Sequence, residues 1–381
     1  MSLISCYEKD VEDFAKEYGR PIDRLYFAEP LVPRALDLVK KLFYGAEIEE
    51  ASDGSVLVAL NSGKVLALIC LPQQSMNARA VLVGETYFIA VNVGVIRLLF
   101  NLSRSIWKDN RFMSHLENLI RDFSELTTDF IPLGFEEIFL HDTFKITDEI
   151  RYTIFYQCFE KSLSFFWLHE VAHVFCGHTD ACKQHGKPLG IIDEFLNAME
   201  FDEDELDESM QKAIPYHAFE IQADRWALDR LFKQLHQQVI AGSANDIHLL
   251  YTVIGCTLFP LLSHGYNLLR NKADLAKYHP PLWFRADEVI LAEDKAANEQ
   301  WFGIEKNEKQ YEVLRFRQKN LVQSGLSALS LLHPMFGDWL GPVLETTRQA
   351  ESQRVLEEAK ILLIPWIDDL SRYSHSPKVK P

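Results

Sequence analysis

The sequence predicts an α+β fold that is predominantly α-helical, with a small sheet in its N-terminal part. Short runs rich in Val, Ile, Tyr and Phe are concentrated in the first hundred residues and are bounded by turn residues, as strands are. From about residue 148 onward, apolar residues recur at helical spacing. The chain has 381 residues, 48% of them hydrophobic, which is enough apolar material for a sizeable core.

The N-terminal part predicts a helix, a hairpin, a further strand and a second helix. Residues 31–44 are typical of a helix introduced by prolines. Residues 55–60 and 64–71 flank an Asn-Ser-Gly turn and predict a β-hairpin. Residues 78–92 predict one more strand, and a helical pattern follows it through Trp107.

Long helices are predicted in the second half. Asp148–His178 indicates a helix that ends at Gly177, and Pro215–Gln237 indicates another with a proline near its start. Ile247–Leu269 is the longest stretch without a formal charge. It contains Pro260 and several polar residues, so we expect a buried helix hairpin rather than a membrane span.

Charge and cysteine content narrow the class of protein. The net charge of −16 argues against nucleic acid and anionic membranes as partners, because both would repel the chain. The first twenty residues mix acidic and apolar side chains and contain no signal-peptide core. The six cysteines are scattered, which favours free thiols in a reducing compartment. We therefore expect a cytoplasmic protein with no nucleic-acid partner and no stable membrane insertion.

The sharpest motif is His-Glu-Val-Ala-His within the first long helix. Its histidines, His169 and His173, lie on one face of the helix with their Cβ atoms about 6 Å apart. Both can therefore bind one tetrahedral zinc ion. Glu170 is rotated by about 100° around the helix, which places it to act as a general base on water rather than as a ligand. An apolar stripe facing a core leaves the other side of the helix to line a cleft; the stripe consists of Ser164, Leu168, Val171 and Phe175.

A second acidic pair lies 47 residues after His173. Glu220 and Asp224 are four residues apart on the second long helix and face the same way. Glu220 can supply a third ligand and leave the fourth position open, as a catalytic zinc requires. Asp224 can accept the second ring N–H of a ligand histidine and fix its tautomer. The alternative is a solvated acidic face that forms a salt bridge with Arg225.

Together the two motifs resemble the gluzincin family of zinc metallopeptidases. The segment His279-Pro280-Pro281-Leu282-Trp283-Phe284-Arg285, and Gly177-His178, are similar to its HtpX-like and CAAX-prenyl-protease branch and to Lit-type phage-exclusion peptidases. The resemblance covers about residues 80 to 290 and implies a zincin-like domain with one Zn²⁺ per chain. It implies the same ligands and base as the spacing does, namely His169, His173, Glu220 and Glu170.

The resemblance also implies roles that the spacing does not. His279 would be a second catalytic residue near the metal, as an oxyanion stabiliser or a removable fourth ligand. Arg285 would brace that loop or a carboxylate near the cleft. Tyr87–Gly94 would be the edge strand that pairs with an extended peptide substrate, which makes Asn92 and Gly94 candidate substrate-binding residues.

The chain departs from these relatives in two respects. HtpX-like enzymes are embedded in the membrane, whereas this chain has no convincing span. An acidic insert at residues 193–210 and the C-terminal helices have no counterpart in the family. We therefore divide the chain into an N-terminal α+β segment (1–76), a zincin-like domain (77–290) and a C-terminal helical extension (291–381) that ends in a polar tail.

These features favour a soluble zinc-dependent endopeptidase that hydrolyses a protein or peptide substrate. One alternative is a latent, regulatory or phage-defence effector that an activating protein partner switches on. A second is a non-catalytic interaction protein that uses its acidic insert. A second zinc site is not favoured, although Cys176, His178, Cys182 and His185 lie close together, because their spacing matches no common zinc finger. We expect a buried thiol at Cys176 and a helix-capping residue at His178.

Overall fold

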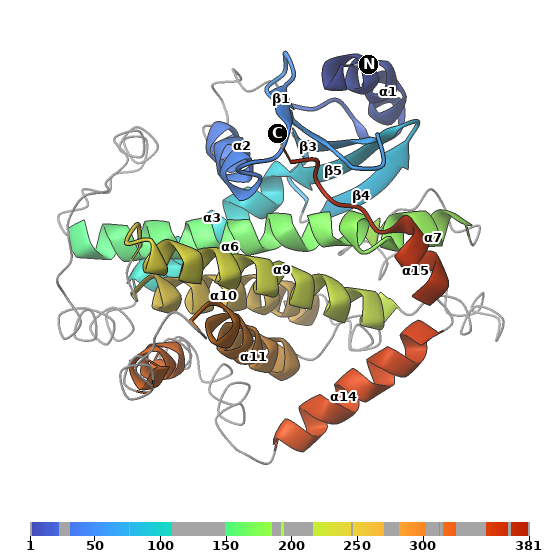
Figure 1. Ribbon diagram of the computed structural model, residues 1–381. Helices are drawn as coiled ribbons and strands as arrows, with labels where there is room; N and C mark the ends of the chain where they lie inside the picture. The colour runs from blue at the N-terminus through green and yellow to red at the C-terminus, as the bar shows by residue number, and fades with distance from the viewer. Residues whose placement is uncertain are drawn as a thin grey trace.

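A mixed sheet packs with one face against a stack of long helices (Figure 1). The computed structural model describes residues 2–22, 31–75, 77–108, 149–184, 192–193, 216–244, 247–269, 282–301, 312, 315–324, 348–364 and 367–379. Within these residues the predicted α+β class with a predominance of helix is confirmed.

The strands are β1 (Ile48–Glu50), β2 (Val56–Ala59), β3 (Val65–Leu71), β4 (Ala78–Val83), β5 (Thr86–Asn92) and β6 (Ile192–Asp193). The helices are α1 (Leu3–Tyr18), α2 (Leu31–Leu42), α3 (Val93–Lys108), α6 (Glu149–Phe175), α7 (His178–Gln184), α9 (Tyr216–Ile240), α10 (Ile247–Leu269), α11 (Leu282–Trp301), α14 (Arg348–Leu363) and α15 (Ile367–Tyr373).

The strands lie in the order β1-β2-β3-β5-β4-β6, in which the β3–β5 pair is parallel and the other pairs are antiparallel. β2 and β3 form the predicted hairpin, whose turn contains Gly63 at a φ of 83°. The prediction of a single strand over residues 78–92 is wrong. Gly84, at a φ of 56°, turns the chain between β4 and β5, and the Asp10 carboxylate holds this turn by accepting the Glu85 N–H at 2.9 Å.

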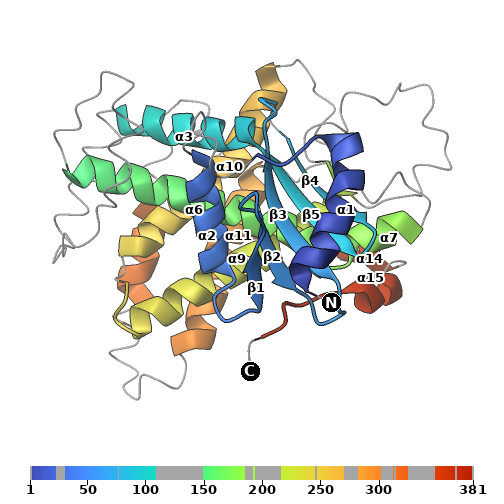
Figure 2. The same cartoon turned by 90° about the horizontal axis from the view of Figure 1, so that it is seen from above.

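Helices cover both faces of the sheet, which explains why the central strands are apolar throughout. Figure 2 shows α1 and α2 on opposite sides of the sheet. Alternate residues of β3 serve the two faces. The residues that pack in one core with α2, α3 and α6 are Leu66, Leu68 and Cys70. The residues that pack toward α1 are Ala67, Ile69 and Leu71.

Helix α6 is the central element, running between the sheet and α9, α10 and α11 (Figure 1). Residues 162–175 are all buried, including the apolar stripe and the face that carries His169 and His173. The expectation that one side of this helix is free is therefore wrong, because α9 packs against the histidine face.

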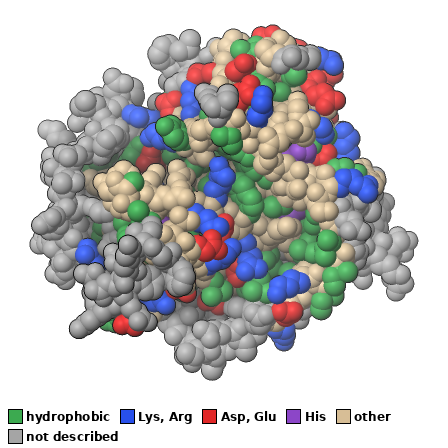
Figure 3. Space-filling model, viewed as in Figure 1, with side chains coloured by type: hydrophobic (Ala, Val, Ile, Leu, Met, Phe, Trp, Pro, Cys, Tyr) green, Lys and Arg blue, Asp and Glu red, His purple; other side chains and the backbone are tan. Residues whose placement is uncertain are grey.

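Residues 247–269 form one continuous helix, α10, and not the predicted hairpin. It packs closely on α6 at Gly255, where an added Cβ would lie 2.6 Å from the Cβ of Lys161 and 2.8 Å from the Ser162 nitrogen. No helix in the described part of the chain has the length and apolar character of a membrane span. On the face shown in Figure 3, acidic and basic side chains are interspersed across the described surface, with hydrophobic side chains between them.

Residues 374–379, which we name the C-terminal strap, return from α15 to the N-terminal hairpin (Figure 1). The strap pairs by backbone hydrogen bonds: the Lys378 N–H donates to Ala59 O at 2.8 Å, and the Glu47 N–H donates to Lys378 O at 2.8 Å. Nearer α15, the His375 N–H donates to Phe175 O at the end of α6. The predicted polar tail is therefore tied to both the sheet and α6.

The strap is also held by a polar cluster around Asp180 on α7. The Tyr87 hydroxyl donates to Asp180 Oδ2 at 2.5 Å, His375 Nε2 lies 3.3 Å from the same oxygen, and Lys64 Nζ lies 3.6 Å from Oδ1. Burial would raise the pKa of Asp180, but the hydrogen bonds from His375 and Tyr87 and the charge of Lys64 outweigh burial. The pKa of this carboxyl is therefore lowered.

A lowered pKa in the folded state stabilises the protein above the unfolded carboxyl pKa of about 3.9, and this stabilisation is lost as the pH falls. We predict that Asp180→Asn lowers the free energy of unfolding by about 1–3 kcal/mol at pH 7, and that the difference from wild type shrinks toward pH 3. Denaturant titrations over this pH range measure both. Asp13→Asn removes an exposed pair with Lys16 and should change little. An Asp180→Asn deficit that stays constant with pH would contradict the prediction.

Candidate metal centre

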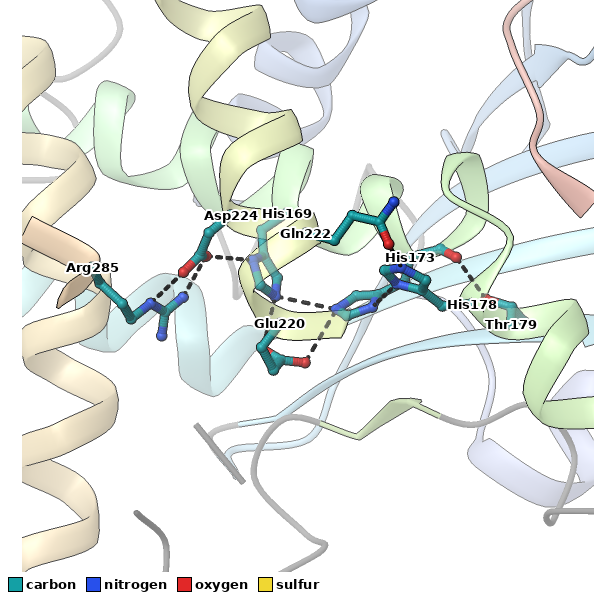
Figure 4. A network of polar contacts seen from close by, with 8 residues as sticks. All are labelled: His169, His173, His178, Thr179, Glu220, Gln222, Asp224 and Arg285. Atoms are coloured by element: carbon teal, nitrogen blue, oxygen red, sulfur yellow. Dashed lines mark hydrogen bonds and ion pairs between the residues drawn. The ribbon is translucent and has the colours of Figure 1, made fainter. Parts of the chain in front are cut away.

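Helices α6 and α9 bring His169, His173 and Glu220 together (Figure 4). The two histidines lie one turn apart on α6 and are fully buried, and Glu220 projects from α9 with 3% of its surface exposed. Apolar residues on both helices form the surrounding core, so the three polar side chains meet in a low-dielectric environment.

The three side chains form a triangle of candidate ligands. His169 Nε2 lies 3.2 Å from His173 Nε2 and 3.2 Å from Glu220 Oε2, and His173 Nε2 lies 3.4 Å from Glu220 Oε1. Zinc–ligand bonds of about 2.0–2.1 Å in a tetrahedron place two ligand atoms about 3.3 Å apart. The ring nitrogens and the two Glu220 oxygens are therefore separated by distances close to those between ligand atoms of a tetrahedral zinc site.

His169 is oriented by an ion pair behind it. Its Nδ1 lies 2.8 Å from Asp224 Oδ1, and Arg285 on α11 donates two hydrogen bonds of 2.6 Å to the same carboxylate. Burial would raise the pKa of Asp224, but the Arg285 charge and the His169 contact outweigh it and lower the pKa. An ionised carboxylate only accepts hydrogen bonds, so His169 carries a proton on Nδ1, and the neutral ring then directs its Nε2 lone pair toward the triangle.

His173 is oriented by a different set of partners. Its Nδ1 lies 3.0 Å from Nδ1 of His178, whose Nε2 lies 2.9 Å from Oε1 of Gln222 (Figure 4). Burial is the main cause that lowers the pKa of His178, to about 4, so this imidazole is neutral at pH 7. The expectation that His178 caps a helix is wrong, because both ring nitrogens face side chains.

The structure places Glu170 next to His169 on α6, where it is fully buried. Its helical position lies off the face that carries the two histidines. Arg225, considered above as a partner of the acidic pair, lies 2.8 Å from Glu288, and Asp224 pairs with Arg285 instead. His279 lies outside the described residues.

The expected edge strand is an interior strand, because β5 pairs with β3 on one side and β4 on the other. The Asn92 N–H donates to Asn77 O at 3.0 Å, and the Gly94 N–H donates to Gln73 O at 3.1 Å. A Cβ at Gly94 would lie 2.2 Å from Gln74 O. These backbone groups hold a neighbouring segment of the chain, so the assignment of Asn92 and Gly94 to a peptide-binding edge is wrong.

Residues 78–92 form two strands, so β4 lies outside β5, and β6 lies outside β4. Ala80 of β4 pairs with Ile192 of β6, and Arg79 of β4 pairs with Asp193. Of the acidic insert predicted at 193–210, the structure describes Asp193 alone.

Sequence reasoning missed the contribution of His178 and Gln222. Gln222 lies two residues from Glu220 and from Asp224, a spacing that places residues on different helix faces. His178 follows a glycine turn at Gly177 with a φ of 81°, so no helical periodicity relates it to His173. Their contact depends on how α6, α7 and α9 pack together.

No family model matches the chain, and neither the curated proteins nor the solved structures include a match to it. The interpretation of the site therefore depends on its geometry.

The contribution of the buried Arg285–Asp224 ion pair to the stability of the protein can be tested. We predict that Arg285→Met, in chelator-treated protein, lowers the free energy of unfolding by about 3–5 kcal/mol, because it leaves a buried carboxylate without its cation. Adding Asp224→Asn should recover much of this loss. The control is Lys295→Met, which removes a more exposed pair with Asp229 and should cost less than about 1 kcal/mol. Equal losses at the two sites in urea titrations would contradict the prediction.

Proposed function

We propose that the chain is a zinc-dependent endopeptidase that holds one Zn²⁺ between His169, His173 and Glu220. The observation that carries this proposal is the buried group of three candidate ligands, whose ring nitrogens and carboxylate oxygens lie 3.2–3.4 Å apart. Two imidazoles and one carboxylate are a ligand set typical of catalytic zinc, which keeps a fourth position for water or substrate. The gluzincin resemblance supports the same assignment.

The donor chemistry fits a divalent cation. The ionised Asp224 fixes the His169 proton on Nδ1, so His169 Nε2 presents a lone pair beside the Glu220 carboxylate. Glu220 and Asp224 carry two negative charges, and Arg285 neutralises one of them. A zinc ion bound there would supply a Lewis acid that polarises the scissile carbonyl and acidifies a water molecule.

The chain's own residues would carry the proton. Glu170 would take it from the attacking water and return it to the leaving amine as the peptide bond breaks. Asp224 and Arg285 would hold His169 in orientation during this exchange. His279 stays a predicted second catalytic residue, on the strength of the resemblance.

Metal content provides the first test. We predict about one zinc per chain in wild-type protein by mass spectrometry, and a much lower content in Glu220→Ala. Glu170→Gln should keep the zinc, because Glu170 is not a ligand. Absence of zinc from wild-type protein purified with ample metal would overturn the proposal.

Proteolysis provides the second test, with new N-termini labelled in a cell lysate treated with the protein. We predict that Glu170→Gln lowers the cleavage rate by at least about 100-fold, in keeping with the loss of a general base, and that chelation abolishes cleavage. Glu160→Gln is the control, since Glu160 lies on the same helix and bonds to the Tyr156 hydroxyl at 2.9 Å. Undiminished cleavage by Glu170→Gln would rule out the assigned base.

A further inference from the structure

His178 is held rigidly between two helices although no role follows for it from the two sequence motifs. Its ring stacks on Phe219 of α9 with a centroid distance of 4.2 Å and an interplanar angle of 12°. The ring is fully buried, and each nitrogen faces one partner: His173 Nδ1 at 3.0 Å and Gln222 Oε1 at 2.9 Å. Stacking fixes the plane of the ring, and the two polar contacts fix its rotation.

The order of partners determines where each proton lies. Gln222 Oε1 is a carbonyl oxygen and can only accept, so His178 Nε2 must carry the proton. In a neutral imidazole the other nitrogen is then an acceptor, so His178 Nδ1 accepts from the Nδ1–H of His173. A neutral His173 ring then has its lone pair on Nε2, which faces His169 and Glu220.

His178 is not placed as a fourth ligand. It contacts His173 on the Nδ1 side, whereas the triangle lies on the Nε2 side of that ring (Figure 4). Its other nitrogen faces Gln222, and among the residues that the structure describes, the group that could hold one ion consists of His169, His173 and Glu220. His178 therefore acts on the site through His173.

We propose that His178 and Gln222 are positioning residues that keep His173 in its metal-binding tautomer. This inference rests on the zinc site proposed above. Without the Gln222 carbonyl, His178 can carry its proton on Nδ1, which forces His173 to accept there and to carry its own proton on Nε2. That proton would point at the metal position and would have to leave before zinc binds.

The experiment measures zinc affinity by competition with a fluorescent chelator, using Zn²⁺ alone as the probe. We predict that Gln222→Leu and His178→Phe each weaken zinc binding by about 10–100-fold, the range for lost hydrogen-bond partners of metal ligands. Gln222→Glu keeps an acceptor and should retain wild-type affinity or exceed it. Thr179→Val is the matched control, because the Thr179 hydroxyl donates to the backbone carbonyl of His173 and not to its ring.

A second readout needs no metal. In zinc-free protein labelled with ¹⁵N-histidine, two-bond proton–nitrogen correlations should show His173 as the Nδ1–H tautomer in wild type and Gln222→Glu. Gln222→Leu should show a substantial Nε2–H population. Thermal unfolding of each zinc-free variant identifies any that fail to fold, and the Leu and Glu variants of Gln222 separate loss of the acceptor from loss of packing.

The possible outcomes separate this inference from the proposed function. Wild-type protein that binds zinc, with equal affinity in Gln222→Leu and His178→Phe, would overturn the positioning role and leave the zinc site standing. Wild-type protein that binds no zinc would overturn both. Weaker binding in Gln222→Leu, recovery in Gln222→Glu and the matching change of tautomer would support the proposal.

Discussion

The packing of α9 against α6 is the constraint on which the candidate site depends, because it buries ionised groups that must be compensated within the protein. Removing a carboxylate from water costs several kcal/mol. Glu220 and Asp224 are both almost completely buried, and Arg285 from α11 compensates Asp224 through two hydrogen bonds. Three helices must therefore meet in register, and a shift of any one of them would separate a buried charge from its partner.

One short stretch of α9 orients both His169 and His173 but gives the two rings different electrostatic environments. Between Phe219 and Asp224 it supplies a stacking surface for His178, a ligand atom, an amide acceptor and a carboxylate. His169 thus has an anionic partner and His173 a neutral one. A carboxylate partner makes an imidazole donate more electron density to a metal. A cation bound here would therefore be more electron-poor than one whose two histidines both had carboxylate partners.

The sequence allowed the two polar pairs of the candidate site to be predicted, because helical periodicity places the members of each pair on one face of their helix. His169 and His173 are four residues apart, as are Glu220 and Asp224, and each pair needed only the rotation of its own helix. The apolar run at residues 78–92 was misassigned because both of its strands are buried and a single glycine marks the turn between them. Helical spacing does not predict the contact of Gln222 with His178, because that contact depends on how the helices pack together. Gly255 lets α10 approach α6 closely, and the sequence pattern does not reveal this contact.

The C-terminal strap gives the protein a late step in its assembly. Asn61 bonds to Ser376 across 315 positions of the chain, and the backbone of Lys378 accepts a hydrogen bond from Glu47 and donates one to Ala59. Closing a loop of that length carries a large entropic cost, so these contacts form after local structure is in place. During synthesis, the backbone groups that bind Lys378 stay exposed to water until residue 378 has left the ribosome. A nascent chain that stalls before this point would present an open sheet edge. Such an edge can be bound by a chaperone or can pair with another chain and aggregate.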